Sequence, residues 1–152
     1  MIRRFGDADL GSLHRMICAA IDASYSGVYP VRAVQFFKEY HSEKKITERS
    51  RTGEVVIIER GGSIVATGAL VGNEIVGVFV TPDDQGQGYG TMIMSELESR
   101  AQAKGLSEVV LSVSLPSRGF YEYLGYEVLA ECSLDVGEGQ HLAYWPGRKA
   151  LT

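Results

Sequence analysis

The feature that most constrains the fold is a glycine-rich segment between two apolar stretches. Residues 75–80 form an apolar run typical of a buried strand, and residues 91–104 place apolar side chains at helical spacing. Between them glycine occupies alternate positions, at Gly86, Gly88 and Gly90. Glycine lets the backbone approach a ligand closely, and free N–H groups in a first helical turn attract phosphate. The segment therefore predicts a strand, a backbone cradle for a diphosphate, and a helix in succession.

Two common nucleotide-binding patterns do not fit this cradle. The dinucleotide fingerprint GxGxxG needs a third glycine at position 91, where the chain has Thr91, and no acidic residue follows at the distance expected for a ribose contact. The P-loop pattern needs a lysine after the glycines, and none is present. A dehydrogenase-type or kinase-type site is therefore disfavoured, and a flexible glycine-rich turn stays open as the alternative to a binding site.

The hydrophobic spacing changes from helical to strand-like at residue 54. Before residue 54, an apolar stripe over residues 10–21 predicts one helix, with Asp7 as its N-terminal cap. Pro30 predicts the start of a second helix, whose charged continuation spans residues 42–51. After residue 54, three strands with tight turns predict an antiparallel meander, and a helix joining the third of these to the next strand predicts a parallel pair. The fold class is α/β with a mixed sheet. The later strands are expected at 55–58, 64–70, 75–80, 109–113, 126–129 and 142–145, and the later helices at 91–104 and 117–124.

Composition bounds the class of protein. At 152 residues the chain is expected to be a single domain, 1–152. Fifteen basic against nineteen acidic residues give a net charge of −4, which argues against nucleic-acid binding. Cys18 and Cys132 show no metal-ligand spacing, so no metal is expected. No apolar stretch approaches the roughly 18 residues of a membrane span, so we expect a cytoplasmic protein that does not contact a membrane.

Two segments together resemble a known family. Residues 85–90, Gln-Gly-Gln-Gly-Tyr-Gly, match the Q/R-x-x-G-x-G/A signature of the GNAT superfamily, the GCN5-related N-acetyltransferases. Residues 120–126, Phe-Tyr-Glu-Tyr-Leu-Gly-Tyr, resemble the second hallmark of that family, FYxxxGF/Y. The resemblance covers nearly the whole chain from Ile2. It implies a central mixed sheet flanked by helices, with a short first strand at residues 2–5 and a splay between strands 4 and 5.

The resemblance also implies a function. It predicts an acetyl-CoA-dependent N-acetyltransferase that transfers the acetyl group directly to an amine of a small molecule or a peptide in a ternary complex. Neither cysteine has a recognisable activating partner, which disfavours a covalent acyl-enzyme. Homodimers are common among relatives. The alternative is a non-catalytic acetyl-CoA-binding domain, and transfer from a longer acyl-CoA or to oxygen also stays open.

Residues for the donor follow from the matched motifs. By resemblance, the backbone of Phe79 and Val80 pairs with the pantetheine arm. Ser114 stands where the family often has an asparagine that contacts the same arm, and a serine has less reach. The expected pyrophosphate-binding residues are Gln85, Gly86, Gln87, Gly88, Tyr89, Gly90 and Thr91.

Two catalytic residues are predicted. Tyr121 occupies the position of the family's tyrosine near the sulfur and is predicted to protonate the departing thiolate, since a phenol with a pKa of about 10 is protonated at neutral pH. A packing role is its alternative. Glu74 is the candidate general base, against the alternatives of a solvent-exposed turn carboxylate or a water chain, and His141 is a weaker candidate. His14 and His41 are interpreted as helix-surface residues.

The acceptor is the least defined part. Residues 22–50 and 126–141 are expected to build its pocket. Four aromatic residues of the first segment either line it or fill the core: Tyr25, Tyr29, Phe36 and Phe37. The net charge agrees with a cationic amine, but a peptide α-amine or a neutral amino compound fits equally well.

Overall fold

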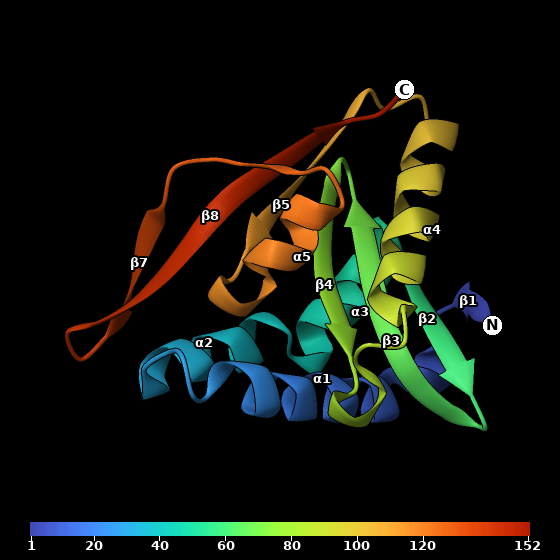
Figure 1. The fold of residues 1–152 in the computed structure, drawn as a ribbon. Helices are drawn as coiled ribbons and strands as arrows, with labels where there is room; N and C mark the ends of the chain where they lie inside the picture. Colours follow the sequence, from blue (N-terminus) through green and yellow to red (C-terminus); the bar gives the residue numbers. More distant parts are fainter.

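The computed structural model describes residues 1–152 as one eight-stranded sheet with helices on both faces (Figure 1). The strand order is β1-β2-β3-β4-β5-β8-β6, and β7 pairs with β8 beside this path. The strands are β1 (Ile2–Arg4), β2 (Glu54–Arg60), β3 (Ser63–Val71), β4 (Glu74–Val80), β5 (Glu108–Val113), β6 (Glu127–Val128), β7 (Cys132–Gly137) and β8 (Gln140–Ala150). The helices are α1 (Leu10–Tyr25), α2 (Val31–Tyr40), α3 (Glu43–Thr52), α4 (Tyr89–Ala103) and α5 (Arg118–Tyr123).

The sheet has the predicted mixed topology. Strands β1 to β4 are antiparallel neighbours, and β5 lies parallel to β4 after the crossover through α4. The β4–β5 ladder contains one residue pair, Glu74 with Val110, strengthened by a 3.0 Å bond from the Val110 N–H to the Asn73 carbonyl. Beyond this pair the two strands diverge, as Figure 1 shows. The expected splay between the fourth and fifth strands is therefore confirmed.

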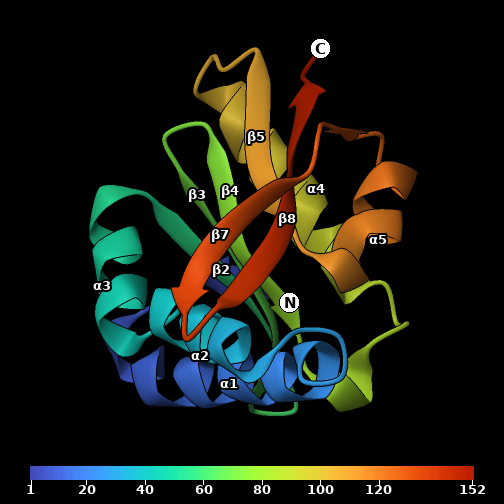
Figure 2. The same ribbon diagram turned by 90° about the vertical axis from the view of Figure 1, so that its left-hand side faces the viewer.

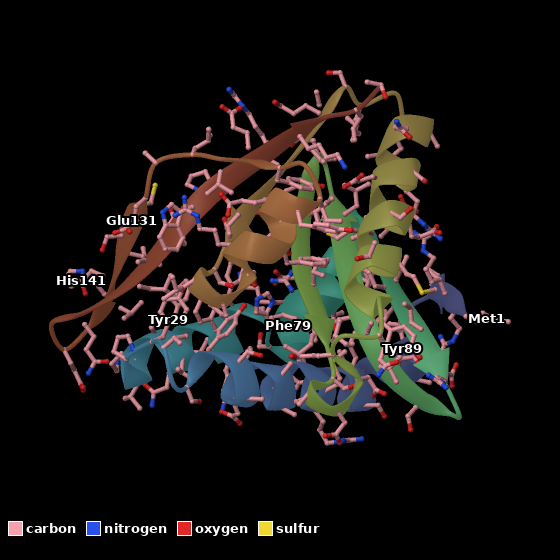
Figure 3. The ribbon with its side chains drawn as sticks, viewed as in Figure 1. Met1, Tyr29, Phe79, Tyr89, Glu131 and His141 are labelled. Carbon is pink, nitrogen blue, oxygen red and sulfur yellow. The ribbon has the colours of Figure 1, made fainter.

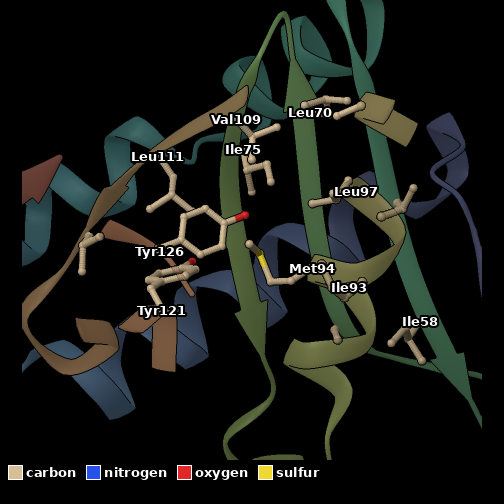
Figure 4. Close-up of a cluster of buried hydrophobic side chains, with 14 of the residues drawn as sticks. Ile58, Leu70, Ile75, Ile93, Met94, Leu97, Val109, Leu111, Tyr121 and Tyr126 are labelled. Carbon is tan, nitrogen blue, oxygen red and sulfur yellow. The ribbon is translucent and has the colours of Figure 1, made fainter. Parts of the chain in front are cut away.

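Alternating side chains of each strand feed two separate cores. In β2, Val56 and Ile58 point to the core under α4, whereas Val55 and Ile57 point to the core under α1, α2 and α3. Figure 2 shows α4 and α5 on one side of the sheet and the first three helices on the other. Figure 4 shows the α4 side, where Met94 packs near two tyrosine rings. This arrangement places the start of α4 and Tyr121 of α5 beside the splayed strands.

The N-terminal caps differ from the expectation. Residues 7–9 form a 3-10 turn rather than a cap at Asp7, and the Asp9 carboxylate accepts the Gly6 N–H at 2.8 Å. The charged segment 42–51 is a separate helix, α3, and not a continuation of α2. Its own cap is Ser42, whose hydroxyl accepts the Lys45 N–H at 3.3 Å. The serine was the sequence signal for this second start.

The C-terminal strands are also more extensive than predicted. The last strand, expected at residues 142–145, runs over Gln140–Ala150, and its partner β7 was not predicted. Strand β7 alternates apolar and polar residues, Cys-Ser-Leu-Asp-Val-Gly, but none of its residues is buried. The two strands form a hairpin that extends past the end of α2 (Figure 1), and Tyr29 ties the segment before α2 to it by donating a 2.8 Å bond to the Ala143 carbonyl.

Candidate active site

The glycine-rich loop is built as a backbone cradle. Gly86 and Gly88 have φ values of 78° and 86°, which side-chain-bearing residues rarely adopt, and Gly88 caps the start of α4. None of the backbone N–H groups from Gln85 to Thr91 donates a hydrogen bond within the chain. These N–H groups lie at the N-terminus of α4, the positive end of the helix dipole. The loop therefore supplies several free donors for one anion.

A pocket of about 400 Å³ lies beside this loop, and we call it the loop pocket. Its charged lining residue is Asp84, so backbone donors and the helix dipole, rather than cationic side chains, must hold an anion there. Arg60 approaches from the β2–β3 turn and hydrogen-bonds the Tyr89 hydroxyl. The residues that line the pocket come from α1, from the end of β4, from the loop and the start of α4, and from segment 116–121.

A second pocket of about 240 Å³ lies farther along β4, toward the start of the strand, and we call it the aromatic pocket. Most of its lining is hydrophobic, with rings contributed by α1, α2, β4 and α5. Phe36 and Phe37 of α2 belong to it, as does Tyr25, whereas Tyr29 does not. The Tyr29 hydroxyl instead accepts the Leu115 N–H at 2.8 Å, which is a structural role.

The two pockets meet where β4 and β5 diverge. Phe79 of β4 and Tyr121 of α5 line both of them. Tyr25, Val78 and Ser117 are also shared. A ligand that lies along β4 from the loop therefore reaches the aromatic pocket at Phe79, whose place in the centre of the molecule is seen in Figure 3.

Tyr121 is buried at this junction with its hydroxyl free. The side chain is 7% exposed, and its ring packs edge-on against that of Tyr126 at 5.7 Å between centroids (Figure 4). Its hydroxyl makes no hydrogen bond within the chain. Burial raises the pKa of Tyr121 above its usual value, with a smaller contribution from Tyr25. The phenol is therefore held protonated, with its proton available to a bound ligand.

Ser114 and Glu74 both line the aromatic pocket. The Ser114 hydroxyl is 2.7 Å from that of Ser117 and accepts from the Tyr25 hydroxyl at 3.1 Å, and it does not reach the loop pocket. Glu74 is half-buried at the start of β4. The structure therefore brings Glu74 and Tyr121 into one pocket, and Ser114 lies on the aromatic-pocket side of the junction.

The three histidines have different surroundings. His141 is exposed on the β7–β8 hairpin, away from Phe79 in Figure 3, and His14 contacts the Cys18 sulfur at 3.5 Å on α1. His41 is not a helix-surface residue, contrary to the expectation. It is 5% exposed and lines the aromatic pocket, with its ring edge-on to Phe79 at 4.9 Å.

The buried His41 is neutral. Its Nδ1 lies 2.9 Å from Nη1 of Arg49, and burial followed by the charge of Arg49 lowers the pKa of His41 to about 3. A single helix continuing through residues 42–51 would leave His41 on its surface. The chain turns between α2 and α3, and that turn directs His41 inward. The Ser42 cap was the available sequence signal.

Other kinds of site are not supported. No group of three or more His, Cys, Asp or Glu side chains is arranged to hold a metal ion. Neither cysteine lines either pocket. Among the helices, none combines the length and the apolar character that crossing a bilayer requires.

Comparisons with known proteins agree with this geometry. A family model described as an acetyltransferase (GNAT) domain matches residues 19–137. A GCN5-related N-acetyltransferase from Rhodopseudomonas palustris superposes with a TM-score of 0.90 at 22% identity, covering 99% of this chain and 95% of that one. The PaiA N-acetyltransferase of Thermoplasma acidophilum, in complex with coenzyme A, gives 0.76 at 20% identity, covering 99% and 98%.

A third structure, yncA of Salmonella typhimurium with its cofactor acetyl-CoA, gives a TM-score of 0.72 at 17% identity, covering 100% of this chain and 94% of that one. No protein with a curated description matches the sequence. At these identities the structural likeness establishes the fold, and the family model establishes the membership. This chain belongs to the GNAT family of N-acetyltransferases.

Proposed function

We propose that the protein transfers an acetyl group from acetyl-CoA directly to an amine. The observation that carries the proposal is the junction of the loop pocket with the aromatic pocket at Phe79 and Tyr121. A donor in one pocket and an amine in the other would meet there without first modifying the protein. The coenzyme A and acetyl-CoA in the Thermoplasma and Salmonella relatives support this donor.

The loop fits the donor's diphosphate. The free N–H groups between Gln85 and Thr91, with the left-handed Gly86 and Gly88, form a concave row of donors at the start of α4. The β4 edge beyond Glu74 has no strand partner on the β5 side, which supports pairing of the Phe79 and Val80 backbone with the amide-bearing arm of the donor. Together the two features suit an extended donor that carries amides and a diphosphate.

The transfer step then uses the residues at the junction. The neutral amine nitrogen forms a bond to the thioester carbonyl carbon, and the carbon–sulfur bond breaks. Before the attack, the acceptor ammonium gives one proton to Glu74, directly or through water, which leaves the neutral amine. Tyr121 gives its phenolic proton to the departing thiolate, and the second proton, lost by the new amide nitrogen, restores the phenol. The neutral, hydrogen-bond-free hydroxyl of Tyr121 supports this role.

Steady-state release of the coenzyme A thiol tests the proposal. Acetyl-CoA is mixed with the protein and with polyamines, amino acids, aminoglycosides or peptide N-termini in turn. We expect amine-dependent thiol release and an N-acetylated product of matching mass for one class. Binding of acetyl-CoA with no turnover of any amine class would instead indicate a binding domain.

A further inference from the structure

Arg49 fixes which nitrogen of His41 carries the proton. The Arg49 Nη1 atom lies 2.9 Å from His41 Nδ1, and Nη2 donates to the Tyr40 carbonyl at 2.7 Å. A guanidinium has donors and no acceptor, so Nδ1 must accept this bond. The neutral imidazole therefore carries its proton on Nε2.

The Nε2–H group is left for the aromatic pocket. It makes no hydrogen bond within the chain. The one fully buried side-chain nitrogen or oxygen without a hydrogen bond is Glu54 Oε2, which lies 2.9 Å from the Lys104 ammonium. Nε2 is thus reached from outside the protein, and His41 lines the aromatic pocket. The ring presents one fixed donor to whatever occupies that pocket.

A positive charge lies behind this donor. Arg49 is half-buried and lies over the Tyr40 ring, 5.2 Å from its centroid. It has no carboxylate within ion-pair distance, and Glu74 and Glu48 act on it only from farther away. Gly77 of β4 leaves room for the pair of Arg49 and His41. A Cβ at Gly77, whose φ is 68°, would lie 3.1 Å from Arg49 Nη1. A cation without an ion-pair partner behind an N–H donor favours a negatively polarised oxygen in front of it.

From these contacts we propose that His41 is a specificity-determining residue that donates a hydrogen bond to an oxygen of the acceptor. The acceptor is then an amine that also carries a carbonyl or carboxylate oxygen on an apolar body, as an amino acid or a peptide-like amine does. The aromatic lining suits the apolar body. A linear polyamine offers the N–H group no acceptor and places its own charge near Arg49. This inference rests on the proposed acetyl transfer.

A matched series of amines tests the preference. The substrates are 2-phenylethylamine, L-phenylalaninamide and L-phenylalanine, which share one body and carry no oxygen, a carbonyl or a carboxylate. We expect kcat/KM for one or both oxygen-bearing amines to exceed that of 2-phenylethylamine by about tenfold, the value of one well-placed hydrogen bond. The two oxygen-bearing arms distinguish a peptide-like from an amino-acid acceptor. Equal kcat/KM across the series would overturn the inference while leaving acetyl transfer intact.

Variants assign the preference to His41. His41→Phe removes the donor and should abolish the tenfold preference, whereas His41→Gln keeps an N–H donor and should retain most of it. His14→Gln, on the outer part of α1, is the control and should behave as the unmodified protein. A preference that survives in His41→Phe, with the variant folded by thermal melting, would contradict the role of His41.

A measurement without turnover keeps the test independent of the activity. In a 15N-histidine NMR spectrum, His41 should show the Nε2–H tautomer, and phenylacetate, an oxygen-bearing ligand without an amine, should shift its Nε2 resonance when coenzyme A is bound. An Nδ1–H tautomer, or no shift with phenylacetate, would overturn the inference. If no amine is consumed but the shift is seen, acetyl transfer fails and oxygen recognition by His41 stands.

Discussion

Phe120 packs against Gly90 so closely that a Cβ at position 90 would lie 3.2 Å from the Phe120 Cζ atom. The contact joins the two sequence segments that resemble the GNAT hallmarks, one at the start of α4 and the other in α5. It holds the free N–H groups of the loop and the Tyr121 hydroxyl on neighbouring walls of one pocket. The contact therefore fixes the position of the glycine-rich loop relative to Tyr121.

The left-handed glycine of the cradle gives the first prediction. Gly88→Ala should lower the free energy of unfolding by about 1 kcal/mol, because alanine is strained at a φ of 86°, and it should weaken acetyl-CoA binding by disturbing the N–H row. Gly105→Ala, at the other end of α4 with a φ of 80°, is the matched control and should lose similar stability without losing affinity. Thermal melts and calorimetric titrations of both variants measure this. Equal affinities of the two variants for acetyl-CoA would show that the glycine-rich loop does not bind it.

Tyr121 gives the second prediction. Tyr121→Phe should lower kcat by about 10²–10⁴-fold, the usual range for a lost general acid, and change the Kd of acetyl-CoA little. Its stability should be nearly unchanged because the hydroxyl has no protein partner. Tyr126→Phe is the control: its hydroxyl donates to Glu98 at 2.7 Å, so it should lose about 1 kcal/mol of stability and keep its kcat. A parallel loss of kcat and of stability in Tyr121→Phe would indicate a packing role.

Glu74 gives the third prediction. Glu74→Gln should lower kcat/KM for the amine by at least about tenfold at neutral pH, because the acceptor loses a group that takes its proton, while acetyl-CoA binding stays the same. Glu127→Gln, a substitution on the exposed strand β6, is the comparison. An unchanged rate in Glu74→Gln would show that Glu74 is not the base and would favour a water chain.

The fourth prediction concerns pH and follows from the low pKa of His41. An unfolded histidine has a pKa of about 6.5, and the folded value is about 3. Between these values the unfolded chain binds more protons, so the contribution of His41 to stability is complete above pH 6.5 and falls as the pH is lowered toward 3. Between pH 6.5 and 4.5 the loss should be about 2–3 kcal/mol.

Urea unfolding at several pH values measures this slope. His41→Gln should flatten it between pH 6.5 and 4.5, whereas the carboxylates with lowered pKa, Asp9 and Glu54, act only at lower pH. The same slope in His41→Gln as in the unmodified protein would show that His41 is not the buried neutral group.

Much of the fold follows from local sequence patterns. The glycines of the turn after β2, the apolar run of that strand and the helical stripes of α1 and α4 each act within a few residues, so the sequence predicted them. For the junction of the two pockets, the sequence offered only the motif around Tyr121 as a signal. The position of His41 depends on a chain turn between two helices and on a partner eight residues later, and no local pattern specifies that contact. Strand β7 owes its place to pairing with β8 rather than to a buried face of its own.

The central claim is that the backbone between Gln85 and Thr91 binds the diphosphate of acetyl-CoA. Isothermal titration of acetyl-CoA, with amide NMR of the same samples, measures it most directly. The account predicts binding at one site per chain, with the largest amide shifts at residues 85–91 and much weaker binding in Gly88→Ala. Absence of heat at saturating ligand, or shifts that avoid the loop, would contradict it.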